Sequence, residues 1–214
     1  SGIGASIAEH FAARGSRVAF LARDEAGGRA RAAGLAGAAG GPPLFLPCDL
    51  VDVAALRAAA AEAETSLGPL RVLVNNAASD DRHRFQDVTP EYWDERMAVN
   101  LRHQFFAAQA VVPGMAGAGG GSIVNLGSIA WVIPSTGLPA YVTAKAAIVG
   151  LTRTLAHELG RQGIRVNCVM PGAIATERQR RLWYTPEYRA VIRARQALDR
   201  ELVPEDVARL VLFL

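Results

Sequence analysis

The chain has 214 residues, of which half are apolar and one-fifth are charged, so it is long enough for one α/β domain with a sizeable core. Its formal net charge of +3 is small and its arginines are scattered, which argues against a nucleic-acid-binding surface. No apolar run reaches the roughly 20 residues that cross a bilayer, and no charged-then-apolar leader precedes the first predicted helix. Four scattered histidines without a Cys-x-x-Cys pattern argue against a metal site. We therefore expect a soluble cytoplasmic protein with neither a membrane nor a nucleic-acid partner.

Continuously apolar runs of about five residues alternate with amphipathic stretches along the chain. The runs predict strands over 17–21, 44–47, 71–75, 122–126 and 164–169. The other stretches predict a short helix within 27–41 and longer helices over 3–14, 52–67, 89–112 and 141–161. Apolar strands separated by helices are typical of a parallel sheet covered on both faces. The sequence thus predicts a single doubly wound, Rossmann-type α/β domain over residues 1–214.

Both ends of the chain depart from this expected pattern. A nucleotide-binding fold of this type needs a strand before Ser1, in the middle of the sheet, and a last strand after the helix predicted near 207–214. A sheet without its central strand would leave neighbouring backbone groups unpaired, at a cost on the order of several kcal/mol. We therefore expect the first and last strands to be missing here and the natural protein to extend beyond both termini.

The single lysine of the chain, Lys145, stands among twenty-two arginines and four residues after one of only four tyrosines, Tyr141. Ammonium is a compact point charge and guanidinium a planar fork, so the two are not equivalent in a crowded site. At positions i and i+4 of a predicted helix, Tyr141 and Lys145 share one face. A cation about 4 Å away at an effective dielectric of about 20 lowers a tyrosine pKa by roughly two to three units, which suits a general base. The alternative is an accidental pair on a solvated helix.

Further residues accompany this pair in a fixed order. Ser128 follows the predicted strand 122–126, and Asn100 stands inside the predicted helix 89–112. Asn100, Ser128, Tyr141 and Lys145 together resemble the catalytic tetrad of the classical short-chain dehydrogenases/reductases. The resemblance implies that Tyr141 exchanges a proton with the substrate oxygen and that Ser128 orients this oxygen. It also implies that Lys145 holds the nicotinamide ribose and that Asn100 positions a water in the proton relay.

Other segments resemble the cofactor-binding motifs of the same family. Residues 1–4 are similar to the end of its glycine-rich turn, where N–H groups at a helix start can bind a pyrophosphate. Segments near 49, 75–78 and 171 resemble its other nucleotide-binding motifs. The resemblance implies an NAD(P) cofactor held by Ser1, Gly2, Ile3, Gly4, Ala22, Arg23, Asp49, Leu50, Asn76, Ala77, Ala78, Tyr141, Lys145, Pro171, Gly172, Ile174 and Thr176.

The residues after the strand 17–21 bear on the choice between NAD and NADP. An Asp at this position hydrogen-bonds the ribose hydroxyls in relatives that prefer NAD. Here Ala22 takes that position and Arg23 follows as a cation that can pair with a 2′-phosphate. Arg23 could instead stack on adenine, and Asp24 could supply the carboxylate. The pattern favours NADP by a small margin.

Two longer segments, 75–103 and 180–188, resemble the aldose 1-dehydrogenases of this family, especially the bacterial D-xylose dehydrogenases. This resemblance implies oxidation of the anomeric hydroxyl of a pentose to an aldonolactone. The loop 79–84 is rich in hydrogen-bonding groups, which a polyhydroxylated ligand needs, and aromatic rings offer flat faces to sugar C–H groups. We expect substrate contacts from Asp80, Ser128, Trp131, Tyr141 and Trp183, with residues 173–203 as a lid-like segment.

Other roles are open for these residues, and other functions are open for the whole protein. The loop 80–84 could be a solvated loop or a subunit contact, and Trp183 could pack within the lid. The chain could be a general carbonyl or 3-oxoacyl reductase, although its polar 79–84 loop suits a long acyl chain poorly. It could also be a nucleotide-binding sensor or scaffold without turnover, but such a protein has no need for a compact cation beside Tyr141.

The predicted helices 89–112 and 141–161 contain more apolar residues than one face toward a sheet would use. This surplus predicts a homo-oligomer, either a tetramer or a dimer. The apolar residues concerned are Phe105, Phe106, Ala107, Val111, Leu151 and Leu155.

Overall fold

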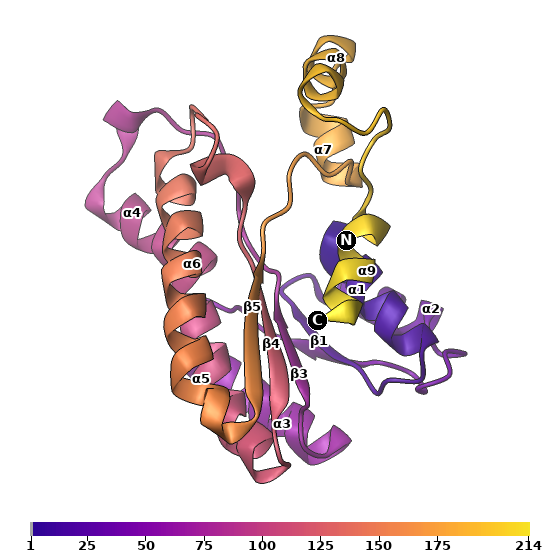
Figure 1. Cartoon of the computed structure of the whole chain (residues 1–214). Coiled ribbons are helices and arrows are strands. Elements are labelled where there is room, and N and C mark those ends of the chain that lie inside the picture. Colours follow the sequence, from indigo (N-terminus) through magenta and orange to yellow (C-terminus); the bar gives the residue numbers. More distant parts are fainter. Residues whose placement is uncertain (1) are drawn as a thin grey trace.

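The computed structural model describes residues 2–214 and has an α/β architecture built on parallel strands (Figure 1). Strand β4 (Gly121–Leu126) lies between β3 (Val72–Asn75) and β5 (Ile164–Val169), and β1 (Ala19–Ala22) pairs with β2 (Leu44–Pro47). Within residues 2–214 no ladder joins β1 to β3, so the strands form two parallel sheets. The predicted fold class is confirmed, and each strand begins within two residues of its predicted start.

Helices connect the strands and cover them. Two of the early helices begin at acidic N-caps: Asp24 accepts from the Gly27 N–H, and Asp52 accepts from the Ala54 and Ala55 N–H groups. The helices are α1 (Gly2–Ala13), α2 (Glu25–Gly34), α3 (Val53–Leu67), α4 (Pro90–Met97), α5 (His103–Gly117), α6 (Pro139–Leu159), α7 (Glu177–Leu182), α8 (Pro186–Arg195) and α9 (Pro204–Phe213).

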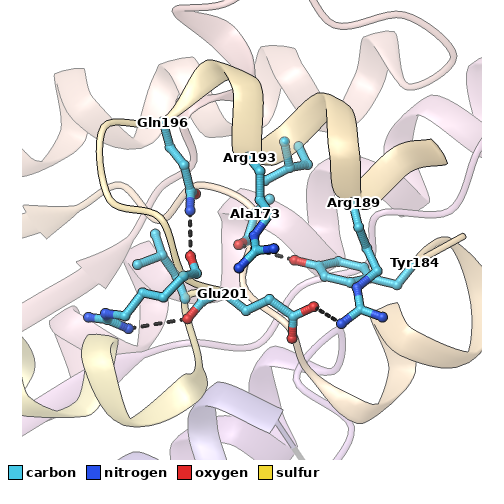
Figure 2. Close-up of a pocket in the computed structure, with 9 residues that line it drawn as sticks. Ala173, Tyr184, Arg189, Arg193, Gln196 and Glu201 are labelled. Carbon is cyan, nitrogen blue, oxygen red and sulfur yellow. Dashed lines mark hydrogen bonds and ion pairs between the residues drawn. The ribbon is translucent and has the colours of Figure 1, made fainter. Parts of the chain in front are cut away.

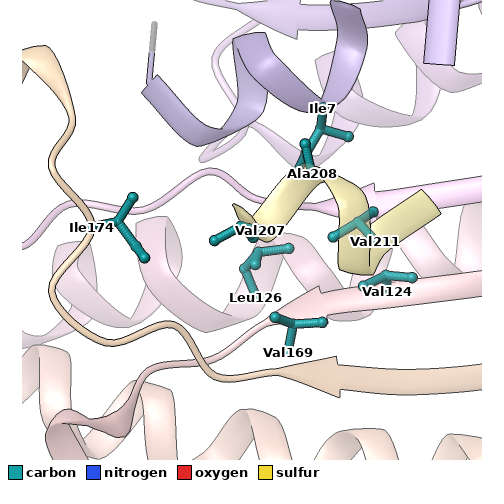
Figure 3. Packing of buried hydrophobic residues seen from close by; sticks show 8 residues of the cluster. All are labelled: Ile7, Val124, Leu126, Val169, Ile174, Val207, Ala208 and Val211. Carbon is teal, nitrogen blue, oxygen red and sulfur yellow. The ribbon is translucent and has the colours of Figure 1, made fainter. Parts of the chain in front are cut away.

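Alternate residues of β4 face two different hydrophobic clusters, because successive side chains of a strand point to opposite faces. Ile123 packs with residues of α5, α6 and β5. Val124 and Leu126 pack with Ile7 of α1 and Val211 of α9 on the other face (Figure 3). The β4 strand is therefore buried on both faces and forms a rigid base for the residues that follow it.

The predicted helix 89–112 is interrupted in the structure. It consists of α4 and α5 joined by a π-helical turn, Ala98–Arg102, and α5 continues to Gly117. The predicted tetrad residue Asn100 lies inside this π turn and is fully buried. Such turns are rare and are frequent at functional sites, but the apolar spacing of the segment does not reveal one.

Part of the predicted subunit contact is wrong. Ala107 and Val111 lie in the core, 6% and 4% exposed, because α5 turns these residues toward β4 and α3. Leu155 packs against the same core. By contrast, Phe105 is 43% exposed, with Phe106 edge-on to its ring. Trp93 on α4 is also exposed, so the apolar surface available to a second copy lies around Phe105 and Trp93.

The segment between β5 and α9 stands apart from both layers, with α7 and α8 projecting beyond the ends of the strands (Figure 1). A bridge between Ile174 and Leu202 closes its base, where the Ala175 N–H donates to the Leu202 carbonyl at 2.8 Å. The segment between β5 and α9 contains residues 173–203, for which the sequence suggests a lid-like role. Among the described residues, no helix is both long and apolar enough to cross a membrane.

Candidate active site

Helix α6 carries Tyr141 in its first turn and Lys145 in its second, as their spacing predicts. Lys145 is only 1% exposed. Its Nζ donates a 2.7 Å hydrogen bond to the carbonyl of Leu126 at the end of β4, and it lies 5.5 Å from the centroid of the Tyr141 ring. A cation and a phenol are thus held together at the carboxyl end of the central strand.

Burial shifts both groups of this pair. It lowers the pKa of Lys145 to about 8, because a charged ammonium loses its hydration in the core. It also raises the pKa of Tyr141, an effect that hydrogen bonding with Ser128 partly offsets. The sequence-based prediction of a lowered Tyr141 pKa is wrong for this structure, because the net shift is upward. Loss of hydration dominates, and the ammonium is directed at the Leu126 carbonyl instead.

Ser128 lies two residues beyond β4, where it begins the short 3-10 turn Ile129–Trp131. Its Oγ accepts the Ala130 N–H at 3.1 Å, so the hydroxyl hydrogen remains available to a partner such as Tyr141 or a ligand oxygen. Below this turn, Asn75 Nδ2 donates to Asn125 Oδ1 at 2.9 Å, and Asn125 Nδ2 donates to Thr152 Oγ1 at 3.0 Å. These buried amides tie β3 and β4 to α6 and fix the height of the helix against the sheet.

Asn100 links the tetrad to the loop 79–84. Its Nδ2 donates to the Arg96 carbonyl at 3.0 Å and its Oδ1 accepts the Ser79 N–H at 2.9 Å. The Asn100 side chain is therefore satisfied by backbone groups. The structure brings Ser128, Tyr141 and Lys145 together, with Asn100 attached through the loop that starts at Ser79.

Most predicted cofactor positions follow the carboxyl ends of strands, where ligands bind in open α/β sheets. Ala22 ends β1, whereas Asp49 and Leu50 follow β2. Residues 76–78 follow β3, and Pro171 and Gly172 follow β5. Ile3 and Ile174 instead pack with the cluster between α1, α9 and β4, so they support the turn through the core. Ser1 lies outside the described residues.

The start of α1 is tightly shaped by two of these positions. Gly2 has a positive φ of 60°, and a Cβ atom there would lie 3.2 Å from Cγ2 of Thr176. A Cβ atom at Gly4 would lie 2.6 Å from Nδ2 of Asn76. A side chain at either position would crowd these neighbours, so the glycines let Asn76 and Thr176 lie against the backbone of the helix start. The predicted cofactor residues from three distant segments do meet.

The charged residues that follow β1 and β2 differ in whether their side chains form hydrogen bonds. Asp24 Oδ1 accepts the Gly27 N–H at 3.0 Å as the cap of α2. Arg23 is exposed, and its guanidinium forms no hydrogen bond or ion pair within the described part of the chain. Asp49 Oδ1 accepts the Val51 N–H at 3.1 Å.

The acidic residues of the loop 79–84 pair with α7. Asp80 forms an ion pair with Arg178 and accepts Gln179 Nε2 at 2.8 Å. Asp81 accepts the second guanidinium nitrogen of Arg178 at 2.9 Å. The sequence indicated Asp80 but not its partners Arg178 and Gln179, because only the fold brings residues about one hundred positions apart into contact.

Asp81 also binds groups beneath the loop. Its carboxylate accepts from Ser79 Oγ at 2.6 Å and from Arg96 at 3.1 Å. The hydrogen bond from Ser79 is the main cause that lowers the pKa of Asp81, with Arg96 and Arg178 adding to it against partial burial. Asp81 is thus ionised at neutral pH and holds the loop to both α4 and α7.

The two predicted substrate tryptophans have different environments. Trp131 ends the turn that follows Ser128 and is 39% exposed. Trp183 lies against the Arg82 guanidinium, 5.3 Å from the ring centroid, while Arg82 also donates to the Thr136 carbonyl at 3.0 Å. Trp131 is open beside Ser128, whereas Trp183 joins the lid-like segment to the loop.

A small pocket lies beneath α8, apart from the tetrad (Figure 2). Tyr184 donates to the Ala173 carbonyl at 3.2 Å, and Glu201 binds Arg180 at 2.6 Å and Arg189 on the other oxygen. These contacts hold α7 and α8 to the chain that enters α9.

Two buried polar residues that the sequence did not single out begin α5. His103 is 2% exposed and Gln104 is fully buried. Burial, and to a smaller extent Lys145, lower the pKa of His103 to about 4, so this imidazole is neutral at physiological pH. Cys48 and Cys168 are free thiols whose pKa values are raised by burial. Among the described residues, no group of three or more His, Cys, Asp and Glu could hold a metal ion.

Comparisons with known proteins agree with this geometry. The family model described as enoyl-(acyl carrier protein) reductase matches residues 1–214. The chain is 52% identical to the probable galactose dehydrogenase GalD of Rhizobium meliloti (strain 1021) and 51% identical to the D-xylose 1-dehydrogenase of Caulobacter vibrioides (strain NA1000 / CB15N), in each case over 100% of this chain and 84% of the relative.

A solved 7 alpha-hydroxysteroid dehydrogenase, complexed with NADH and 7-oxo glycochenodeoxycholic acid, superimposes with a TM-score of 0.94 at 31% identity. The match covers 100% of this chain and 83% of that structure. The chain is an oxidoreductase that belongs to the short-chain dehydrogenase/reductase family.

Proposed function

We propose that this protein is an NAD(P)-dependent aldose 1-dehydrogenase that oxidises the anomeric hydroxyl of a pentose, such as D-xylose or L-arabinose, to an aldonolactone. The observation that carries the proposal is the direct connection of the polar loop 79–84 to the tetrad, through the Ser79 N–H and Asn100. The names of the galactose and D-xylose dehydrogenases that match the whole chain support the sugar class.

The residues present fit a nicotinamide dinucleotide. Gly2 and Gly4 have no side chains and bring Asn76 and Thr176 against the start of α1, whose backbone N–H groups are the kind of donors that a pyrophosphate needs. Asn76 and Thr176 lie beside this helix start, and Lys145 is bonded to the Leu126 carbonyl at the end of β4. When bound, the cofactor supplies the hydride acceptor.

In the proposed reaction the Tyr141 phenol first passes its own proton to the relay water, and the resulting phenolate then takes the proton of the anomeric hydroxyl, while Ser128 donates its hydrogen to the same oxygen. Lys145 favours this phenolate, and it would also hold the cofactor ribose. Asn100 positions a water that exchanges protons with solvent. Because burial raises the Tyr141 pKa, we expect the phenol to be protonated at neutral pH before this first transfer.

The lid-like segment 173–203 completes the proposed site. The bonds of Arg178 and Gln179 to Asp80 hold this segment to the loop 79–84. We propose that a sugar hydroxyl competes with these partners for Asp80, while Trp131 and Trp183 border the ring. Residues 1–214 act as a single catalytic domain in this proposal.

Two further features belong to the proposal. Arg23 favours NADP, because Asp24 is engaged as a helix cap and Ala22 offers no carboxylate.

The exposed Phe105 and Trp93 are placed to contact a second copy of the chain, so we propose a homo-oligomer, located in the cytoplasm. Light scattering at micromolar concentration tests this assembly, and a monomer would refute it.

The rival function is reduction of a carbonyl or 3-oxoacyl substrate, which the description of the matching family model favours. A panel of aldoses, offered with each cofactor and read by nicotinamide absorbance, separates the two. The proposal requires one or more pentoses to be oxidised. Activity on acetoacetyl thioesters above that on every aldose would support the rival.

A further inference from the structure

Helix α6, which carries Tyr141, begins without a capping side chain of its own. Its N-cap residue, Leu138, has no polar side chain, and Pro139 in the first turn has no N–H. The first N–H of the helix therefore belongs to Ala140. Because the first turn of a helix has no intrahelical acceptors for its N–H groups, an acceptor must come from elsewhere.

His83 supplies this acceptor from the loop 79–84. Its Nε2 accepts the Ala140 N–H at 3.3 Å, although the two residues are 57 positions apart. The backbone N–H of His83 donates to the carbonyl of Gly137 at 2.9 Å. The loop is therefore attached at two points to the start of the helix.

The hydrogen-bond partners of the two ring nitrogens fix the tautomer of His83. Nε2 must be unprotonated to accept an N–H, so the proton of the neutral ring lies on Nδ1. Nδ1 is 3.0 Å from the carbonyl oxygen of Asp81 and 2.9 Å from the hydroxyl oxygen of Tyr92, both of which can accept this proton. The Tyr92 ring also packs edge-on against the imidazole, with centroids 4.9 Å apart.

We propose that His83, in its neutral Nδ1-protonated form, is a positioning residue that holds the first turn of α6 and thereby sets the place of the Tyr141 phenol. The role rests on the proposed function, in which Tyr141 takes the substrate proton. Tyr141 directly follows the capped residue Ala140, whereas Lys145 is one turn deeper and is held independently by Leu126. Loss of the cap therefore displaces the phenol more than the ammonium.

This arrangement has a consequence for rate, because a misplacement of about 1 Å at a reacting group can cost on the order of 100-fold. His83→Phe keeps a flat ring beside Tyr92 but removes the acceptor. We expect kcat to fall roughly 10-fold to 100-fold in this variant. We also expect the KM for the cofactor to be unchanged, since Lys145 and the glycine turn stay in place. His83→Gln offers an amide oxygen near the position of Nε2 and should restore much of kcat.

His157→Phe is the matched control, because His157 is exposed in the last turn of the same helix, and it should leave kcat unchanged. Activities are compared with the fastest substrate found, whether sugar or not, so failure of the sugar assignment leaves the comparison intact. A kcat for His83→Phe within about twofold of the wild type, or a Gln variant no better than Phe, would overturn the proposal.

Two measurements need no turnover. Long-range ¹H–¹⁵N correlation should show His83 protonated at Nδ1 alone, and hydrogen exchange at residues 140–143 should be faster in His83→Phe while the rest of α6 stays protected. A proton on Nε2, or unchanged exchange in the first turn, would contradict the cap. These outcomes are distinct from failure of the proposed function, which would appear as a wild type that oxidises no aldose.

Discussion

Lys145 donates from the core of the protein to the carbonyl of Leu126, with its ammonium nitrogen 2.7 Å from that oxygen and its side chain 1% exposed. A guanidinium is larger and planar, so an arginine could not occupy this space without displacing β4 or Tyr141. We predict that Lys145→Arg abolishes turnover nearly as fully as Lys145→Ala, although the charge is retained.

The steady-state kcat/KM of both variants measures this effect. Arg153→Lys, at an exposed position of the same helix, is the control and should be close to wild type. A Lys145→Arg enzyme within about fivefold of the wild type would show that compact geometry at this position is unimportant.

The same burial makes stability depend on pH. The pKa of Lys145 is about 8 in the folded protein, against an ordinary value of 10.5, so the unfolded state binds more protons between these values. Stability from this group must therefore rise as the pH increases from about 8 to 10.5. Lys145→Met removes the titration, and we predict that its gain in Tm over the wild type is largest below pH 8 and shrinks toward pH 10.5.

Thermal unfolding of the two proteins in parallel at several pH values tests this, since all other titrating groups cancel in the difference. A Tm difference that stays constant, or grows with pH, would mean that the ammonium is not desolvated in the folded state.

Arg23 should affect the two cofactors differently. We predict that Arg23→Ala raises the KM for NADP more than the KM for NAD, because the guanidinium pairs only with a 2′-phosphate. Arg29→Ala, which removes an exposed arginine paired with Glu25 on α2, is the control and should change neither KM. Equal effects on both cofactors, or a wild type that does not use NADP, would assign Arg23 to the adenine face.

Features that follow from a regular spacing of residues could be predicted from the sequence. Strand positions followed from apolar runs that parallel strands need on both faces, and the shared face of Tyr141 and Lys145 followed from the period of a helix. The π turn at Asn100 could not be predicted in this way, because one extra residue in a helical turn leaves no distinct apolar pattern.

Contacts between segments far apart in the chain could not be predicted from the sequence either. The pairing of Asp80 with Arg178 and the cap that His83 gives to Ala140 depend on loops that the fold brings together. The raised pKa of Tyr141 could not be predicted from spacing, because a Coulomb estimate omits the loss of hydration on burial. Likewise, apolar composition alone does not distinguish the core residues Ala107 and Val111 from surface ones, because their burial depends on the packing of α5 against both β4 and α3.

The proposed function requires the site to accept a polyhydroxylated substrate. A site built to pair several hydroxyls penalises a ligand that leaves buried polar groups unpaired, at roughly 1 to 3 kcal/mol each, so two such groups give on the order of a hundredfold preference or more. The direct measurement is the ratio of kcat/KM for D-xylose or L-arabinose to that for cyclohexanol, with the lactone trapped by hydroxylamine. We predict a ratio of about one hundred or higher with a trapped lactone. A ratio near one, or faster turnover of acetoacetyl thioesters than of every aldose, would contradict it.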